Sequence, residues 1–277
     1  METALIHSPF TIHQQMIIGK SKRELEKMRA AGRLVAQVRE ELRRMVAPGV
    51  TTLELDMAAE KMIRDAGAIP TFKGYHGFPF SICASVNEQI VHGFPSAYAL
   101  QDGDIFSLDC GVTLGGYVGD TATTVPVGRV SDDRLKLIRV AEECLERAIA
   151  QCWPGQHLGD IGWAVQELAE AEGYGVVRDY VGHGIGRKMH EDPQIPNYGK
   201  PGTGIKIRSG YVFAIEPMLN MGTQKTKTLK DGWTVVTLDG RPSAHVEHTV
   251  AITEEGPEVL TRLAEGQHGP QAGTASA

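Results

Sequence analysis

The sequence repeats itself at an almost constant interval, and this duplication limits the possible folds more than any other feature. Four matches share the interval to within one position: Pro48-Gly49 with Pro154-Gly155, Gly67 with Gly173, His76-Gly77 with His183-Gly184, and Gly103 with Gly210. Chance readily produces any single match in a chain with 32 glycines. The segments GDIFSLD and GYVFAIE, which begin at Gly103 and Gly210, nevertheless align over their whole length and both end in an acid. We therefore predict one structural unit that is used twice.

Each copy of the unit begins with a pattern typical of two helices. Ser21 with Glu24, and Thr51 with Glu54, form capping-box patterns ahead of apolar residues at helical spacing. The second copy repeats the helical pattern over residues 132–153 and again from about residue 160 to Gly173. In the first pattern the apolar positions are Leu25, Met28, Val35, Val38, Leu42 and Met45.

Segments typical of strands follow the helices. Residues 104–112 and 117–125 read as neighbouring antiparallel strands joined at Gly115-Gly116. Two helix-helix-strands units bury their apolar faces by pooling the strands in the middle and packing the helices outside. The prediction is an α+β fold with a pseudo-twofold axis, a central antiparallel sheet and four outer helices.

The composition restricts which binding partners and which cellular compartment we expect for this protein. With 277 residues and 42% hydrophobic content, the chain can bury a sizeable core. Its net charge of -6 argues against long-range attraction to nucleic acid or to an anionic membrane. No apolar run reaches the roughly 18 residues of a membrane helix, and the N-terminus lacks a signal-peptide pattern. The four cysteines include no C-x-x-C pair, so a cytoplasmic protein in a reducing compartment is predicted.

The acids that end the aligned segments, Asp109 and Glu216, are candidate ligands. Strand alternation places Asp109 on the face opposite Phe106. An acid on an apolar strand is costly to bury without a partner, and the duplication brings both acids to one axis. Asp120 and Glu247 follow the two strands in Val-Gly-Asp-Thr and Val-Glu-His-Thr. Four carboxylates therefore converge.

One histidine, His183, joins the carboxylates from the glycine-rich segment Gly182-His-Gly-Ile-Gly. A lone Asp or His is more often structural, but four carboxylates and an imidazole without Lys or Arg suit hard or borderline divalent ions. Two ions about 3.5 to 4 Å apart can bind a bridging water and polarise a carbonyl. The segment lacks the phosphate-loop pattern, which argues against nucleotide binding.

Two further histidines are candidates outside the metal shell. His92 ends an alternating segment at a glycine, and His190 follows shortly after His183. Either can donate a hydrogen bond to a developing oxyanion or to the scissile amide. The cysteines Cys110, Cys144 and Cys152 show no nucleophile motif and are assigned to packing.

These residues resemble the type I methionine aminopeptidases of the creatinase-like pita-bread fold. The resemblance runs from about Ser21 to Thr261. The motifs that carry it are Tyr75-His-Gly-Phe, Val86-Asn-Glu with His92-Gly, Leu108-Asp-Cys-Gly-Val with Gly119-Asp-Thr, Gly182-His-Gly-Ile-Gly with His190-Glu, Ile215-Glu-Pro-Met and Val246-Glu-His-Thr.

The resemblance implies a ligand set identical to the one read from the residues. Asp120 and Glu247 would bridge two ions, His183 and Glu216 would bind one of them, and Asp109 would bind the other. Glu216 would also move the proton of the bridging water. Oxygen-rich sites with one imidazole accept Co, Mn, Fe or Zn, so composition leaves the metal open.

The resemblance also implies the residues that touch the substrate. His92 would contact the scissile nitrogen and His190 the carbonyl side of the substrate. Phe72 and Met189 stand where many relatives have a Cys or small residue and a Phe, which affects the rim of the methionine pocket. That pocket would be formed by Tyr75, Phe78, Cys83, His92, Met189 and Trp233.

The implied activity is removal of the initiator methionine from nascent proteins whose second residue is small. The partners would be nascent N-termini, at the ribosome, with no nucleic acid or membrane bound, and the enzyme would be a monomer. We expect one catalytic domain over residues 21–262, with halves at about 21–128 and 129–262, a mobile extension over 1–20 and a flexible tail over 263–277.

Two other functions stay open at this point. An Xaa-Pro aminopeptidase or prolidase shares the five-ligand pattern but usually carries an additional N-terminal domain. A non-catalytic pita-bread module that binds peptides predicts lost ligands, whereas all five are present.

Overall fold

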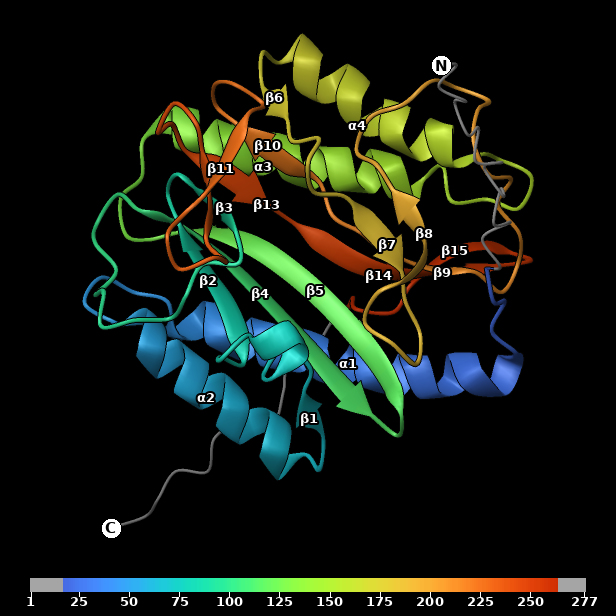
Figure 1. Cartoon of the computed structure of the whole chain (residues 1–277), viewed down its shortest axis with the longest axis horizontal. Coiled ribbons are helices and arrows are strands. Elements are labelled where there is room, and N and C mark those ends of the chain that lie inside the picture. The colour runs from blue at the N-terminus through green and yellow to red at the C-terminus, as the bar shows by residue number, and fades with distance from the viewer. Residues whose placement is uncertain (1–16, 264–277) are drawn as a thin grey trace, which may run out of the picture.

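The computed structural model describes residues 17–263, and Figure 1 shows the whole chain. Most of the expected N-terminal extension (1–16) and of the expected tail (264–277) lies outside the described residues. Residues 17–20 lead into the first helix. There the Lys20 N–H donates to the carbonyl oxygen of Gly210 at 2.6 Å, and Nζ forms an ion pair of 2.6 Å with Glu191.

Helices form at the places that the capping patterns predict. Both capping boxes are made: Glu24 accepts from the Ser21 N–H at 3.0 Å, and Glu54 accepts from the Thr51 N–H at 2.7 Å. The α-helices of the described chain are α1 (Lys22–Met45), α2 (Thr52–Asp65), α3 (Asp132–Ile149) and α4 (Leu158–Ala171). Helices α2 and α4 are equally long and are separated by the same interval as Gly67 and Gly173, so the duplication is kept in register there.

Three helix predictions need correction. Met45 is 40% exposed, because α1 ends at this residue and its last turn leaves the core. Helix α3 ends at Ile149, short of residue 153, since a turn leads there into Pro154-Gly155 and a residue before proline disfavours helix. Helix α4 begins slightly earlier than expected, with Asp160 accepting from the His157 N–H at 2.7 Å.

Within residues 17–263 all strand pairs are antiparallel, and nine strands form the main sheet. Its order is β1-β4-β5-β14-β9-β7-β8, with β2 also on β4 and β15 on β14. Two three-stranded sheets, β13-β10-β6 and β11-β12-β3, lie beside it. The strands are β1 (Ile69–Pro70), β2 (Ile82–Val86), β3 (Gln89–Val91), β4 (Ile105–Leu114), β5 (Tyr117–Pro126), β6 (Gly175–Val176), β7 (Gly182–Gly184), β8 (Glu191–Ile195), β9 (Val212–Ile215), β10 (Met218–Asn220), β11 (Thr226–Thr228), β12 (Val235–Thr237), β13 (Ser243–His245), β14 (Glu247–Thr253) and β15 (Gly256–Val259).

The predicted hairpin is formed by β4 and β5. Leu114 pairs with Tyr117, and Gly115 and Gly116 have φ of 58° and 79°, the positive values that a type I′ turn requires. Strand alternation also holds: Phe106, with Leu108, Cys110 and Val112, packs in the core formed with α1 and α2. Asp109 therefore projects from the other face.

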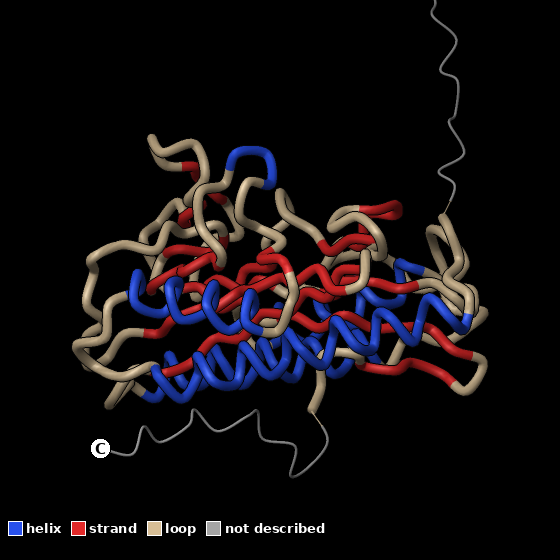
Figure 2. Tube along the Cα trace, turned by 90° about the horizontal axis from the view of Figure 1, so that it is seen from below, coloured by secondary structure: helices blue, strands red, loops and turns tan. Residues whose placement is uncertain are grey.

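The layers follow from these faces. Helices α1 and α2 cover the half of the sheet around β4, and α3 and α4 cover the half around β9 and β14 (Figure 1). Figure 2 shows the long helices on one side of the strands, with loops and a short helical turn on the other side. This is the predicted α+β pita-bread fold. Among residues 17–263, no helix is both long and apolar enough to span a bilayer.

One of the repeat matches is not structural. His76 lies in a single 3₁₀ turn, η1 (Tyr75–Gly77), whereas His183 lies in β7. In the topology β7, which pairs with β9, corresponds to β2, which pairs with β4. The match between His76-Gly77 and His183-Gly184 is therefore a coincidence of sequence.

Candidate active site

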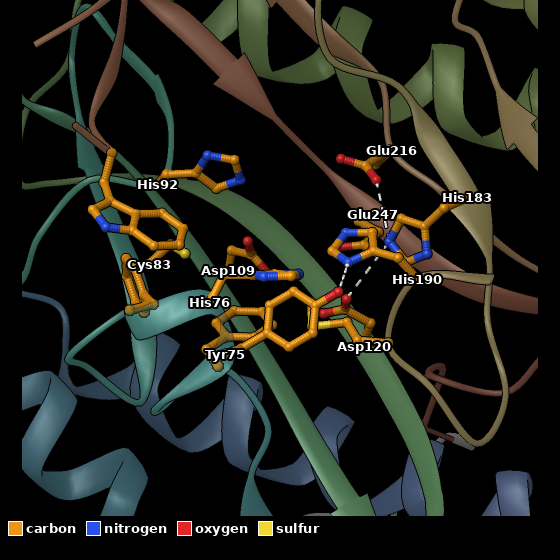
Figure 3. A pocket seen from close by; sticks show the side chains of 14 residues that line it. Tyr75, His76, Cys83, His92, Asp109, Asp120, His183, His190, Glu216 and Glu247 are labelled. Carbon is orange, nitrogen blue, oxygen red and sulfur yellow. Dashed lines mark hydrogen bonds and ion pairs between the residues drawn. The ribbon is translucent and has the colours of Figure 1, made fainter.

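A cavity of about 420 Å³ opens on the face of β4 that points away from α1 and α2. Every residue that the sequence assigned to the site lines it, together with Phe72 and His76 (Figure 3). The lining residues are Phe72, Tyr75, His76, Phe78, Cys83, His92, Asp109, Asp120, His183, Met189, His190, Glu216, Trp233 and Glu247.

Three of the carboxylates lie in one row across the sheet. Asp109 on β4 pairs with Ala122 on β5, and Ala122 pairs with Glu247 on β14. Glu216 directly follows β9, whose last residue pairs with the neighbour of Glu247. Directly opposed side chains lie about 4.5 to 5.5 Å apart at Cβ, so this register alone gathers the three acids. The small side chain of Ala122 leaves the space between Asp109 and Glu247 open.

A second row, two positions along each strand, carries Asp120 and His183, the other two candidate ligands. Asp120 on β5 pairs with Gly111 on β4, and His183 on β7 pairs with Ala214 on β9. Thr249 on β14 lies between them in this row. Its Oγ1 accepts from the Asp120 N–H at 3.0 Å and donates to the Asp120 carbonyl oxygen at 2.8 Å. The positions between these ligands are small or hydroxylic, which leaves room for ions above the sheet.

Among the described residues, the buried carboxylates have no Lys or Arg as an ion-pair partner. Burial, followed by the neighbouring carboxylates, raises the pKa values of Asp109, Asp120 and Glu247 well above their usual range. Burial raises the pKa of Glu216 to about 8. Within residues 17–263 the ion-pair contacts of these acids are to His183 and to His245, and none is to Lys or Arg.

Unpaired oxygens in this group fit a cation. Asp109 Oδ1, Asp120 Oδ1 and Glu247 Oε1 are buried without a hydrogen-bond partner in the described part of the chain. Such groups are costly unless a charge of opposite sign compensates them. The ligand atoms of Asp120, His183 and Glu247 all lie within 4.8 Å of one another, so these three residues can hold a metal ion.

The imidazole of His183 is oriented as a metal ligand. Its Nδ1 lies 2.9 Å from the carbonyl oxygen of Gly184, which leaves Nε2 to face the acids. Nε2 is 3.6 Å from Glu216 Oε1 and 4.0 Å from Asp120 Oδ2. Burial lowers the pKa of His183 to about 3, so the ring is neutral near pH 7 and presents a lone pair.

His92 and His190 face the cavity from different halves of the chain. The His92 ring lies 6.2 Å from that of Trp233, and burial lowers its pKa to about 4, with His245 and His190 adding to the shift. His190 Nδ1 lies 2.8 Å from the Tyr75 hydroxyl. Within residues 17–263 neither ring forms a hydrogen bond or an ion pair with a carboxylate of the two rows, so both are free to meet a substrate.

An apolar wall continues from the ligand rows. Phe72, Phe78, Cys83 and Met189 form a buried cluster against which Tyr75, Phe80, Phe94 and Trp233 pack. The Phe78 and Trp233 rings meet edge to face at 5.1 Å. Phe72 lies directly on Gly111 of the second row, where an added Cβ would be 2.6 Å from its ring. The cavity is therefore polar at the sheet and aromatic beside it.

Comparison with known proteins gives the family. Residues 26–254 match metallopeptidase family M24. Methionine aminopeptidase 1 of Bacillus subtilis (strain 168) is 54% identical over 248 residues, which cover 90% of this chain and 100% of the relative. The chain belongs to the methionine aminopeptidases of metallopeptidase family M24. The resemblance predicted from the motifs is confirmed.

Solved structures agree with this membership. A methionine aminopeptidase from Thermotoga maritima has a TM-score of 0.88 at 45% identity, covering 90% of this chain and 100% of that one. A prolidase from Pyrococcus furiosus has a TM-score of 0.72 at 22% identity, covering 89% of this chain and 66% of that one. At that identity the prolidase shares the fold alone.

Sequence reasoning missed two histidines of this M24 site. His76, which the sequence analysis gave as a repeat match and within the Tyr75-His-Gly-Phe motif but did not assign to the site, lines the cavity and contacts Tyr75 with ring centroids 4.3 Å apart. His245 is 2% exposed, and its Nε2 lies 3.6 Å from Glu216 Oε2. Strand alternation was a usable signal for His245, because a residue two positions before Glu247 shares its face.

Proposed function

We propose that this protein hydrolyses the first peptide bond of nascent proteins that begin with methionine and have a small second residue. The observation that carries the proposal is that the aromatic pocket lies directly beside the two rows of candidate metal ligands. The two meet at Phe72, which contacts Gly111 of the second row. The 54% identity to a protein named methionine aminopeptidase 1 supports the choice of methionine. We assign the reaction to the cytoplasm, at nascent chains on the ribosome, and to a monomer.

The five ligands are suited to hold two divalent ions. Asp120 and Glu247 are proposed as the shared ligands, with His183 and Glu216 on one ion and Asp109 on the other. When bound, such ions would lower the pKa of a coordinated water and would polarise the scissile carbonyl. The chemistry of the donors, oxygen with one imidazole, suits Co, Mn, Fe or Zn.

The remaining residues act on the substrate. Glu216 lines the cavity beside the other acids and is proposed to accept the proton of the attacking water and pass it on. His92 is proposed to hydrogen bond to the scissile nitrogen. His190, oriented by the Tyr75 hydroxyl at 2.8 Å, is proposed to donate to the carbonyl oxygen of the substrate.

The apolar wall selects the side chain that is removed. The aromatic rings of Phe78 and Trp233 and the flexible side chain of Met189 line this wall. Together they can enclose the linear thioether of a substrate methionine. Contacts between sulfur and aromatic rings contribute about 0.3 to 1.5 kcal/mol. Phe72 and Met189 both belong to this wall, so we expect the depth of the pocket to be set by this pair.

A peptide panel tests the proposal. Met-Ala-Ser, Met-Lys-Ser and Ala-Pro-Ser peptides are incubated with protein loaded with Mn²⁺ or Co²⁺, and free amino acids are measured. We expect rapid release from Met-Ala-Ser, slow release from Met-Lys-Ser and almost none from Ala-Pro-Ser. Preferential cleavage before proline would identify a prolidase-type enzyme, and no cleavage with either ion would identify a binding module.

A further inference from the structure

His245 is a buried imidazole beside the ligand rows to which the proposed mechanism gives no part. Its side chain is 2% exposed, and Nε2 has no hydrogen-bond partner among residues 17–263. Such a buried polar atom is uncommon in native proteins and calls for an explanation. The charged atom opposite is Oε2 of Glu216, 3.6 Å from Nε2.

The carboxylate of Glu216 lies between two imidazoles. Oε1 is 3.6 Å from His183 Nε2, and Oε2 is 3.6 Å from His245 Nε2. A carboxylate that binds a cation is ionised and only accepts hydrogen bonds. The nitrogen of His245 that faces Oε2 must then be the one that carries the hydrogen.

The distance between the two groups is only slightly longer than a hydrogen bond. The last side-chain torsion of Glu has a broad energy minimum. A small rotation of the Glu216 carboxylate therefore brings Oε2 within bonding distance of His245 Nε2 at little cost.

Both backbones are already fixed. The Thr124 hydroxyl accepts from the His245 N–H at 2.9 Å and donates to the His245 carbonyl at 2.7 Å. Asn197 Nδ2 donates to the carbonyl oxygen of Glu216 at 2.9 Å. The carboxylate of Glu216 can still rotate about its last side-chain torsion. His245 lies where a hydrogen bond to this carboxylate would fix its orientation.

We infer that His245 is a positioning residue, whose Nε2–H binds Oε2 of Glu216 and turns Oε1 toward the ion shared with His183. The inference rests on the proposed function, because that proposal makes Glu216 a ligand. Hydrogen bonds that orient metal ligands in this way are typically worth about 10- to 100-fold in metal affinity or activity. This role requires a hydrogen-bond donor at position 245, and it does not require the side chain at that position to gain or lose a charge.

Three variants test the role. His245→Phe keeps a planar ring and removes the donor, and His245→Gln restores an N–H donor. His248→Phe is the matched control, because this partly buried histidine directly follows Glu247 in the sequence. Its ring Nδ1 lies 2.8 Å from Thr261 Oγ1, whereas the residue opposite Glu216 Oε2 is His245. Affinity of the metal-free proteins for Co²⁺ and Mn²⁺ is measured by calorimetric titration, with the visible spectrum of the Co²⁺ form and thermal unfolding beside it.

We expect His245→Phe to weaken the binding of one ion by about 10- to 100-fold and to change the Co²⁺ spectrum. His245→Gln should recover most of the affinity, and His248→Phe should bind both ions as wild type does. Unchanged affinity and spectrum in His245→Phe would overturn the inference. Equal losses in the Phe and Gln variants would overturn it too, since that pattern reports packing and not hydrogen bonding. These titrations use no substrate, so failure of wild-type protein to cleave methionine peptides counts against the proposed function alone.

Discussion

The two halves of the molecule share a plan but differ in how far apart they place their acids. In the first half Asp109 and Asp120 lie on the two arms of one hairpin, β4–β5. In the second half Glu216 and Glu247 are much further apart in sequence, because β10, β11, β12 and β13 intervene. The shared plan delivers two carboxylates from each half to the seam where β5 pairs with β14.

Substrate-facing groups come from the places where the halves differ. The segment of β10 to β13 in the second half places Trp233 in the lining of the cavity and His245 beside Glu216. The first half has a 3₁₀ turn with Tyr75 and His76 ahead of β2, and among the described residues no such turn lies directly ahead of β7, the counterpart of β2. The shared plan thus places the four carboxylates, and the segments in which the halves differ supply Tyr75, His76, Trp233 and His245 around them.

The largest expected effect comes from removing one central carboxylate from each half. Asp120→Asn and Glu247→Gln should each lower kcat by about 10⁴-fold or more, the scale seen when a member of a catalytic unit is lost. Both should also bind less metal, because each acid is proposed to be shared by both ions. Turnover and metal content per chain are measured side by side. Normal metal content with normal activity in either variant would contradict the sharing, and a defect in one variant alone would show that the halves contribute unequally.

Histidines from the two halves give the next largest effect. His92→Ala and His190→Ala should each keep wild-type metal content and lose about 10² to 10³ in kcat, the usual loss for one transition-state hydrogen bond. Tyr75→Phe, which removes the partner of His190 and keeps the ring, should lose less. Metal analysis with steady-state kinetics checks this. Loss of metal in His92→Ala would move that residue into the ligand set.

The halves also differ in what the sequence could predict. Features fixed by near neighbours were predictable: the caps at Ser21 and Thr51, the hairpin turn, and the face of Asp109 by alternation. The candidate ligands were predictable as well, since the aligned segments mark Asp109 and Glu216 as equivalent.

Long-range register lay beyond sequence reasoning. The two ligand rows depend on the alignment of β4, β5, β14 and β9, which no short segment encodes. Strand alternation gives the face of His245, but it does not say that Glu216 lies opposite its ring. The His76 match failed because a short His-Gly pair says nothing about the pairing of the surrounding backbone.

Removing the ions should weaken the seam between the halves in a pH-dependent way. Burial raises the folded-state pKa of Glu216 from 4.5 to about 8, so the folded metal-free protein binds more protons than the unfolded chain between these values. Its stability must then fall as pH rises through this window. Bound cations displace the protons, so metal affinity should rise with pH. The difference in Tm with and without chelator should therefore grow from pH 6.5 to pH 8. A constant or shrinking difference would contradict the raised pKa.

We expect the smallest effect at the glycines that follow the second helix of each half. Substitutions there test whether the duplicated helices are equivalent, without changing the active site. Gly67 and Gly173 have φ of 71° and 82°, and no atom of the described chain lies within 4 Å of a Cβ built on either. An alanine there meets no neighbour, so its cost is that of left-handed backbone alone, about 1 to 2 kcal/mol. Gly67→Ala and Gly173→Ala should thus lower stability by equal amounts, and asparagine should cost less at both sites because it tolerates this conformation. Denaturant unfolding of the four variants gives the free energies, and the peptide assay should show unchanged kcat in each. Unequal losses would mean that the two helix ends, although equivalent in sequence and backbone angle, are not equally coupled to the rest of their halves.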